Sequence, residues 1–216
     1  MNQIMNARQK VVEKGVQILE TSLTVGTWGN ISCRIPSEDC FAITPSGMNY
    51  ETLKPEDVVI VDFNGKILNG TRKPSIELPL HLAIYHARQD IQAIIHTHSA
   101  YATAMATARK GIPGAVEDLV QIVGGDVRVN EYALPGTPQL GINTVKALEG
   151  RNAVLLANHG MLGVGKDLDE ALRVCQVVEK SAKIILFARL MGGAIELSQE
   201  DITGMRNFYL NDYGQK

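Results

Sequence analysis

Apolar and polar residues follow two different periods along this chain, and each period predicts a different element. In several segments apolar residues recur every three to four positions, a spacing that gathers them on one side of a helix. These segments are 9–23, 77–88, 100–109, 144–148 and 168–190. We expect each of them to be helical, and the last to form one long helix.

Short apolar runs with many β-branched residues separate these segments and predict strands. The runs span residues 30–35, 40–44, 58–62, 91–95, 127–132 and 153–157. Asn64-Gly65 is a hairpin signal that leads into a further short strand at 66–68. Hairpins early in the chain and helices between the later strands predict an α/β fold, a three-layer α/β/α sandwich with a mixed, largely antiparallel central sheet.

Length and composition are those of an ordinary globular chain. The 216 residues suit one domain spanning 1–216, and 45% of them are hydrophobic and 20% charged. A net charge of −2 gives no reason to expect nucleic acid or an anionic membrane as a partner. No apolar run approaches the roughly 20 residues of a membrane span, and the N-terminus lacks a signal-peptide pattern, so we expect a cytoplasmic protein. Three cysteines without Cys-x-x-Cys spacing, Cys33, Cys40 and Cys175, fit a reducing compartment and packing roles.

Three of the five histidines stand at the ends of apolar runs. His96 and His98 follow the run 91–95, and on a strand residues i and i+2 point to the same face about 7 Å apart, so this pair can chelate one ion. His159 follows the run 153–157. A single histidine in such a place is usually a core or loop residue, whereas three imidazoles suit an open divalent-metal site. The trio therefore predicts metal binding.

Glu77 opens the helical segment 77–88 and has two interpretations. As a first-turn acid it suits the positive end of the helix dipole, and Ser75 nearby can cap the helix. As a functional residue it would be a fourth metal ligand or a general acid/base, because substrate can displace a carboxylate and leave it free to move a proton. His81 lies four residues on, on the same face, and either holds this carboxylate in place or packs. His86 is interpreted as a surface residue.

Two loops beside predicted strands combine glycine with hydroxyl or amide side chains. They are Thr27-Trp28-Gly29-Asn30 and Thr44-Pro45-Ser46-Gly47. Such loops can present backbone N–H groups to a phosphate, although a simple turn explains each of them as well.

Seven short motifs, taken together, resemble one known family. They are Gly29-Asn30-Ile31-Ser32, Thr44-Pro45-Ser46-Gly47, Pro74-Ser75-x-Glu77, His96-Thr97-His98, Gly124-Gly125, Tyr132-Ala133-x-x-Gly136-Thr137 and Asn158-His159-Gly160. Their order and spacing are similar to those of the class II aldolase/adducin head family, and most similar to its L-fuculose-phosphate aldolase branch. The resemblance runs from about residue 8 to the C-terminus. The combination is much more specific than any one motif.

The resemblance implies a lyase. In this family one Zn²⁺ ion per subunit, or another divalent metal, is held by the three histidines with Glu77, and Glu77 exchanges a proton during carbon–carbon cleavage. The substrate would be a ketose 1-phosphate, either L-fuculose 1-phosphate or a related deoxy or methylthio sugar phosphate. The products would be dihydroxyacetone phosphate and an aldehyde. The positions that match the phosphate site are Gly29, Asn30, Ser46, Gly47 and Ser75.

The resemblance also implies a homotetramer with active sites at subunit interfaces, where a C-terminal tyrosine donates a proton to the neighbouring site. Tyr213-Gly214 matches that context, unless it is only a loose tail. Two positions depart from the branch. Ile76 stands in place of a second serine, which removes one phosphate donor, and Glu117-Asp118 stand near the place of a tyrosine. Unless these acids are a solvated helix face, Glu117 is a third catalytic candidate, and the proton donor stays open among Glu117, Asp118 and Tyr213.

Other members of the family leave alternatives to an aldolase. Sugar-phosphate 4-epimerases resemble this scaffold but have aspartate at the position of Glu77, whereas dehydratases retain glutamate. Adducin-type heads are non-catalytic and lack the complete metal set, which this chain has. We therefore expect aldolase chemistry, with an epimerase or dehydratase as the alternative and a non-catalytic role as a remote one.

Overall fold

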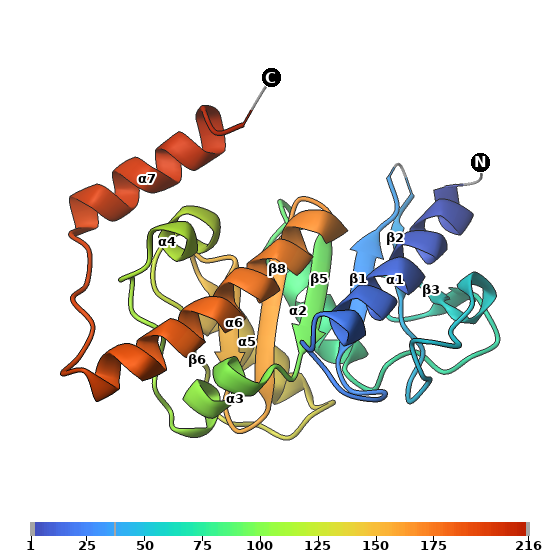
Figure 1. Ribbon diagram of the computed structural model, residues 1–216. Helices are drawn as coiled ribbons and strands as arrows, with labels where there is room; N and C mark the ends of the chain where they lie inside the picture. The colour runs from blue at the N-terminus through green and yellow to red at the C-terminus, as the bar shows by residue number, and fades with distance from the viewer. Residues whose placement is uncertain (1–2, 37, 215–216) are drawn as a thin grey trace.

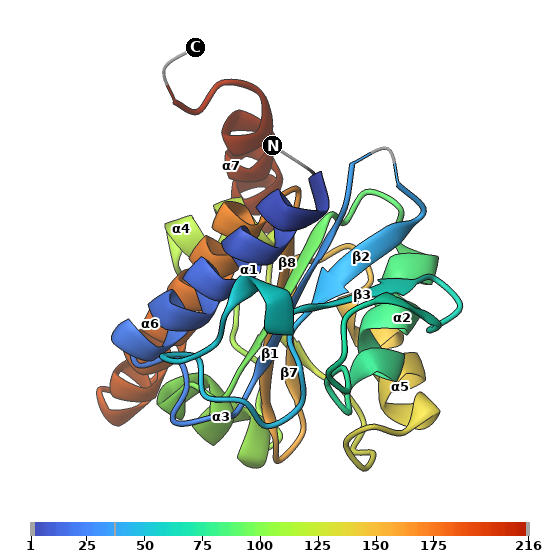
Figure 2. The same ribbon diagram turned by 90° about the vertical axis from the view of Figure 1, so that its right-hand side faces the viewer.

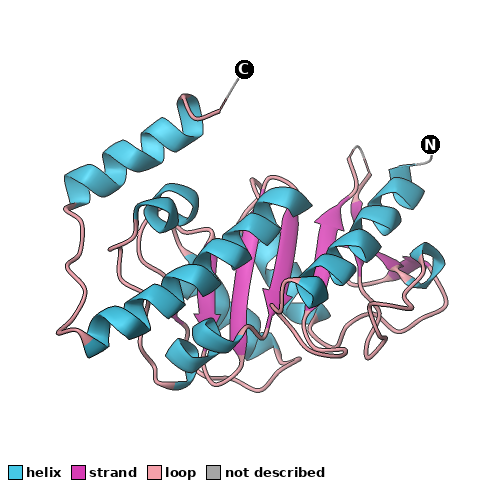
Figure 3. Ribbon diagram, in the orientation of Figure 1, coloured by secondary structure: helices cyan, strands magenta, loops and turns pink. Residues whose placement is uncertain are grey.

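The computed structural model describes residues 3–36 and 38–214. One eight-stranded sheet runs through the middle of the protein, with helices on both of its faces (Figure 1, Figure 3). The predicted three-layer α/β/α architecture is therefore confirmed. The sheet sits between two separate apolar cores, one for each face.

The sheet is mixed and largely antiparallel, as predicted. Its strands are β1 (Asn30–Arg34), β2 (Cys40–Ile43), β3 (Val59–Asp62), β4 (Ile67–Asn69), β5 (Ala93–Thr97), β6 (Arg128–Val129), β7 (Ala153–Leu156) and β8 (Gly160–Gly165). Their spatial order is β4-β3-β2-β1-β5-β8-β7-β6, and within the described ranges only the β6–β7 pair is parallel. The central strand β5 places His96 opposite Asn30 of β1 on one side and opposite Leu162 of β8 on the other.

Helices cover the two faces of the sheet unequally. On one face lie α1 (Gln3–Glu20), α3 (Ala100–Thr107), α4 (Glu117–Val123) and α6 (Leu168–Leu190), and on the other lie α2 (Leu78–Ala87) and α5 (Pro138–Leu148). Figure 2 shows α1 and α6 along one face, with α2 and α5 together on the other. α7 (Gln199–Asn211) packs against α4, and a 3-10 turn (Pro55–Asp57) precedes β3. Alternation along β5 serves both cores, because Ile95 packs on the α6 side and Ile94 on the α2 side.

Several element bounds differ from the sequence pattern. The helix expected at 9–23 is α1, which begins at Gln3, and the strand expected at 127–132 shortens to β6. The helix expected at 144–148 is α5, which begins six residues earlier, at Pro138. Proline is tolerated at the first helical position because the N–H groups of the first turn have no partner within the helix. The long helix at 168–190 and the hairpin at Asn64-Gly65, which joins β3 to β4, are confirmed.

The sequence pattern does not predict β8 or α7, for different reasons. β8 contains three glycines, which weaken a strand pattern. A Cβ at Gly163 would lie 2.8 Å from Sγ of Cys175 in α6. The glycine that weakens the strand pattern is therefore also what allows α6 to pack closely on the sheet. In α7, Ile202, Met205 and Tyr209 do recur at helical spacing, but this signal covers only two turns and only Ile202 of the helix is buried.

Two smaller expectations concern the cysteines and membranes. All three cysteines are buried and unpaired, and burial raises the pKa of Cys33 and Cys175 to about 12. Their packing role is therefore confirmed. Among the described residues, no helix combines the length and the apolar character that crossing a membrane requires.

Candidate functional site

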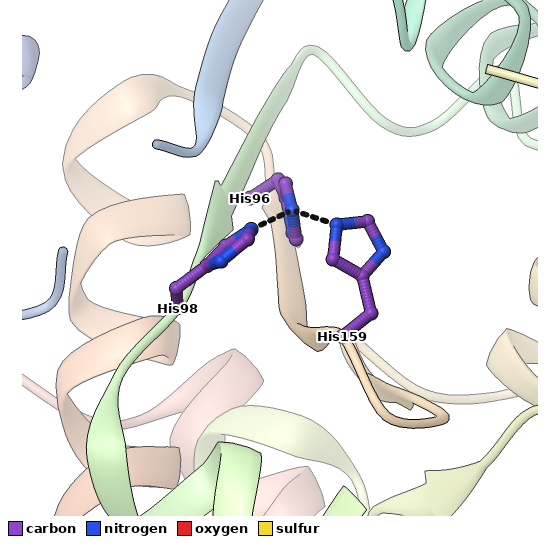
Figure 4. Close-up of side chains that lie close together, drawn as sticks. All are labelled: His96, His98 and His159. Atoms are coloured by element: carbon purple, nitrogen blue, oxygen red, sulfur yellow. Dashed lines mark hydrogen bonds between the residues drawn. The ribbon is translucent and has the colours of Figure 1, made fainter. Parts of the chain in front are cut away.

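Three histidines meet where β5 ends and where β7 turns into β8 (Figure 4). His96 lies within β5, His98 lies just beyond its end, and His159 lies in the turn before β8. Nε2 of His96 is 2.9 Å from Nε2 of His98 and 3.2 Å from Nε2 of His159. The structure thus brings the three predicted ligands together, although they come from segments more than 60 residues apart.

The surroundings of these rings favour neutral imidazole. His96 is fully buried, and its Nδ1 lies 2.8 Å from the Met161 carbonyl, so Nδ1–H is the donor and Nε2 keeps a bare lone pair. Burial and neighbouring imidazoles lower the pKa of His96 and of His98 to about 3, and burial also lowers the pKa of His159. Metals bind the neutral ring, so the trio is in the coordinating form at neutral pH.

The spacing of the donor atoms fits a divalent cation. Ligands of tetrahedral Zn²⁺ lie about 2.0–2.1 Å from the ion and therefore about 3.3 Å from one another. The two separations from Nε2 of His96, 2.9 and 3.2 Å, are close to that value. A coordinating nitrogen from each ring lies within 4.8 Å of the other two. The three rings could therefore hold one ion and leave a position open for substrate.

Glu77 lies beside this cluster at the N-terminus of α2. Its Oε2 is 3.3 Å from Nε2 of His96, and its Oε1 is 3.6 Å from Nε2 of His159. Glu77 is the N-cap residue of α2, where a carboxylate suits the positive end of the helix dipole, but its side chain makes no capping hydrogen bond to the helix. Oε2 accepts a hydrogen bond from Nδ2 of Asn30 at 2.7 Å, whereas Oε1 is buried with no hydrogen-bond partner among the described residues. A buried, unpaired carboxylate oxygen beside three lone pairs is suited to a cation or a proton.

The loop 44–47 runs alongside the segment that leads into Glu77. The N–H of Ser46 donates to the Lys73 carbonyl, and the N–H of Ser75 donates to the Thr44 carbonyl, both at 3.0 Å. Ser75 is buried, and its Oγ accepts from the N–H of Glu77 at 3.2 Å. The structure therefore places the candidate phosphate residues Ser46, Gly47 and Ser75 in two adjoining segments next to the carboxylate.

The loop before β1 lies close to the histidines. Gly29 has φ +83°, and a Cβ there would lie 2.5 Å from the His96 carbonyl, so only glycine lets β1 start this close to β5. The side chain of the next residue, Asn30, points to Glu77. On the other side of Gly29, Trp28 is exposed and stacks on His98 with ring centroids 5.7 Å apart. The third segment of the candidate phosphate site thus borders both Glu77 and the histidine cluster.

Comparison with known proteins places this site in a family. The model for the class II aldolase and adducin N-terminal domain matches residues 9–186. The chain belongs to this family. The predicted resemblance is thereby confirmed, and aldolases among the relatives support an enzyme of the aldolase family.

Relatives of this class II aldolase family member act on several sugar phosphates. The chain is 36% identical over 213 residues to 5-deoxy-D-ribulose 1-phosphate aldolase of Bacillus thuringiensis serovar kurstaki, and the match covers 99% of both chains. A solved L-fuculose 1-phosphate aldolase superposes with a TM-score of 0.92 and 40% identity, covering 95% of this chain and 96% of that one. L-ribulose-5-phosphate 4-epimerase UlaF of Salmonella paratyphi C is 31% identical over 199 residues, 87% of each chain. The fold and family are thus shared by enzymes with different substrates.

Two catalytic candidates of this family member lie apart from the histidines. Glu117 is exposed at the first residue of α4, and its neighbour Asp118 forms an ion pair with Lys180 of α6. Tyr213 is exposed and lines a cleft with Arg88, which lies near the beginning of β5, whereas the histidines lie at the end of that strand. Within one chain, neither Glu117 nor Tyr213 lies at the histidine cluster.

Sequence reasoning misses the polar side chains that lie behind Glu77. Ser32 and Tyr85 are both fully buried and hydrogen bonded to each other at 2.8 Å. Ser32 belongs to the motif Gly29-Asn30-Ile31-Ser32, but nothing in the sequence of β1 indicates which partner its hydroxyl has. Tyr85 could have been found, because Glu77, His81 and Tyr85 are four residues apart and share one face of α2.

Proposed function

We propose that the protein is a Zn²⁺-dependent aldolase that cleaves a ketose 1-phosphate to dihydroxyacetone phosphate and an aldehyde. The observation that carries the proposal is the carboxylate of Glu77, held with one oxygen unpaired, beside three neutral histidines. Zinc is the ion of choice because three imidazoles with one open position are its usual catalytic ligand set. Another divalent metal with similar ligand preferences could take the place of zinc at this site.

The metal, when bound, supplies a Lewis acid for the negative charge that develops on the substrate oxygens. Glu77 moves the proton. Its Oε1 has no competing hydrogen bond, so it can accept a proton from a substrate hydroxyl or carbon next to the cluster and return it after cleavage. Besides moving the proton, the carboxylate could serve as a fourth ligand of the metal in the absence of substrate.

The substrate phosphate binds, in this proposal, across the adjoining loops. Gly29, Asn30, Ser46, Gly47 and Ser75 line it. The hydroxyls of Ser46 and Ser75 and the backbone of the glycines provide donors without a lysine or arginine. Ile76 is 66% exposed beside them and offers no donor, which leaves the phosphate with one hydrogen bond fewer than a second serine would allow.

We favour a 5-deoxy or methylthio pentulose 1-phosphate over L-fuculose 1-phosphate as substrate. The relative that matches the chain along 99% of its length is named for 5-deoxy-D-ribulose 1-phosphate. The aldehyde from such a pentulose lacks the hydroxyl carried by the aldehyde from L-fuculose 1-phosphate, so it suits the exposed apolar side chain of Trp28, which stacks on His98.

We further propose a cytoplasmic homotetramer with active sites at subunit interfaces, in which Tyr213 serves the site of a neighbouring subunit. Exposed apolar residues near the end of α6 support contact with another copy. Leu190, Met191 and Ile195 are between 81% and 93% exposed. Tyr213, exposed and remote from its own histidines, is free to reach a partner's site.

A 4-epimerase is the second candidate, because the likeness to the ribulose-phosphate epimerase covers most of both chains. Dehydration is a further alternative, since dehydratases of the family retain glutamate. A non-catalytic, adducin-like role is the remote one, and the intact histidine set argues against it.

A substrate panel tests these alternatives. Purified protein loaded with zinc is given 5-deoxyribulose 1-phosphate, its methylthio analogue, L-fuculose 1-phosphate and L-ribulose 5-phosphate, with metal content measured on the same sample. We expect dihydroxyacetone phosphate from the deoxy or methylthio substrate at the highest kcat/KM. Isomeric pentulose phosphate without triose phosphate would favour the epimerase, and a zinc-loaded protein that releases no triose phosphate from any substrate would refute the aldolase.

A further inference from the structure

A chain of buried hydrogen bonds leads from Glu77 into the protein. Nδ2 of Asn30 donates to Oε2 of Glu77 at 2.7 Å, and Nε2 of His81 lies 2.5 Å from Oδ1 of Asn30. On the other side of the ring, Nδ1 of His81 is 2.6 Å from Oγ of Ser32, which is 2.8 Å from the hydroxyl of Tyr85. All five residues are at most 4% exposed. Water is thus excluded from the whole chain.

Two elements build this chain from regular spacing. Asn30 and Ser32 are alternate residues of β1 and point to the same face of the sheet. Glu77, His81 and Tyr85 are successive i, i+4 positions of α2, on the face that packs against that side of the sheet. Interleaving the two sets gives every linking polar atom except Oε1 of Glu77 at least one hydrogen-bond partner, which offsets much of the cost of burying them.

The chemistry of each atom fixes the direction of the donors. An ionised carboxylate only accepts, so Asn30 must turn its NH₂ to Glu77 and its carbonyl to His81. The protonated nitrogen of His81 is then Nε2, and its bare Nδ1 accepts from the Ser32 hydroxyl. Because that hydroxyl has one proton, the Tyr85 O–H must donate to Ser32. Every donor therefore points toward Glu77, and burial, which lowers the pKa of His81 to about 3, keeps the ring neutral.

We propose that His81 is a positioning residue that holds Glu77, through Asn30, with Oε2 fixed and Oε1 turned to the histidine cluster. The inference rests on the proposed aldolase function for its kinetic consequence, but not for the hydrogen-bond direction itself. Without the Nε2–H of His81, the amide of Asn30 can rotate and present its carbonyl to the carboxylate. Glu77 would then lose its donor, and the orientation of the base would no longer be fixed.

Two substitutions at position 81 differ mainly in reach. In His81→Gln the side-chain NH₂ lies close to where Nε2 of histidine was and can donate to Asn30, whereas in His81→Asn it is one methylene too short. His86→Gln is the matched control on the same helix, because His86 is exposed and bonds only the Phe63 carbonyl in the described structure.

We expect His81→Asn to lower kcat by about 10- to 100-fold with KM and bound zinc little changed, because partners of this kind affect activity by that factor. His81→Gln should recover most of that loss, and His86→Gln should match the wild type. Equal losses in the Asn and Gln variants, or a loss that follows zinc content or thermal unfolding, would make His81 merely structural.

A second measurement does not depend on activity. Nitrogen NMR of histidine-labelled wild type, with His81 assigned from the spectrum of His81→Gln, reports which ring nitrogen carries the proton. We expect Nε2–H with bare Nδ1, and no titration at mildly acidic pH. An Nδ1–H ring would overturn the proposal even in an active aldolase. If instead the wild type cleaves none of the panel, the proposed function fails while the tautomer still decides the direction of this chain.

Discussion

The two ends of the central strand β5 differ in how firmly a single chain holds the residues proposed for catalysis. At its C-terminal end His96 and Glu77 are buried, and Oε2 of Glu77 lies between Nε2 of His96 and the Asn30 amide. At its N-terminal end Tyr213, 64% exposed, lines an open cleft with Arg88. Both ends carry a residue proposed for proton transfer, but only the first holds that residue in place.

The difference agrees with the proposed division of roles between one chain and the homotetramer. A base must be oriented before substrate arrives, which needs burial and fixed partners such as those of Glu77. A proton donor that serves the site of another subunit cannot be oriented by burial within its own chain. It has to stay exposed until the oligomer forms. The proposed metal site and the proposed base are therefore testable in one subunit, and the proposed role of Tyr213 only in the oligomer.

The largest effect is expected at His96, whose Nε2 is close to both other rings. His96→Ala should bind zinc below stoichiometry and fall to background activity, because two imidazoles do not form the open three-ligand site. Elemental analysis and the aldolase assay measure this, with circular dichroism to show folding. A folded, active H96A protein would contradict the site.

Replacing Glu77 should be nearly as severe while sparing the metal. Glu77→Gln keeps the shape but cannot accept a proton, so we expect kcat to fall by about 10²- to 10⁴-fold with zinc retained. Glu117→Gln is the comparison, and it should lose far less because Glu117 is exposed and apart from the cluster. Equal losses in the two variants would move the proton transfer to α4.

Tyr213 tests the other end of β5. Tyr213→Phe should lower kcat by about 10²-fold if the hydroxyl is the proton donor, with Tyr209→Phe, which keeps a neighbouring ring, as control. Mixed oligomers decide where it acts. Refolding Y213F subunits with H96A subunits should restore activity, because an intact histidine site can then meet an intact tyrosine. No recovery in mixed oligomers would place the donor within one chain.

Acid should destabilise the buried end through its histidines. The pKa values of His81, His96 and His98 lie at about 3 in the folded protein against an ordinary 6.5. Between these values the unfolded chain binds more protons, so stability is complete above pH 6.5 and decreases as the pH falls toward 3. Urea unfolding of metal-free protein at several pH values measures this slope. A stability that stays flat across the window would show that the rings are already protonated when folded.

The smallest effect is expected at Ile76, beside the phosphate loops. Ile76→Ser adds one hydrogen-bond donor, and a net gain of about 0.5–1.5 kcal/mol corresponds to a KM about 2- to 10-fold lower with kcat unchanged. Ile76→Ala removes the same side chain without adding a donor and serves as control. If Ala and Ser lower KM alike, the isoleucine acts by its bulk.

Part of the fold could be read from local pattern and part could not. The helix at 168–190 and the strand that leads into His96 carry strong periods, and both are present. β8 stayed hidden because its glycines serve the packing of α6, a contact between distant segments. α7 was not predicted because its apolar residues Ile202, Met205 and Tyr209 keep a helical spacing over only two turns.

The sequence by itself determined the donor set: which imidazoles and which carboxylate were available, and their place at the ends of apolar runs. Residue type and alternation are local properties, so they can be read without a fold. Only the tertiary structure decided that the carboxylate of Glu77, at the start of α2, faces the cluster, and that Asn30 links it to His81. These contacts depend on the register of β1 against β5 and on how α2 packs on the sheet. Neither can be predicted from the local sequence, because both are set by contacts between distant segments.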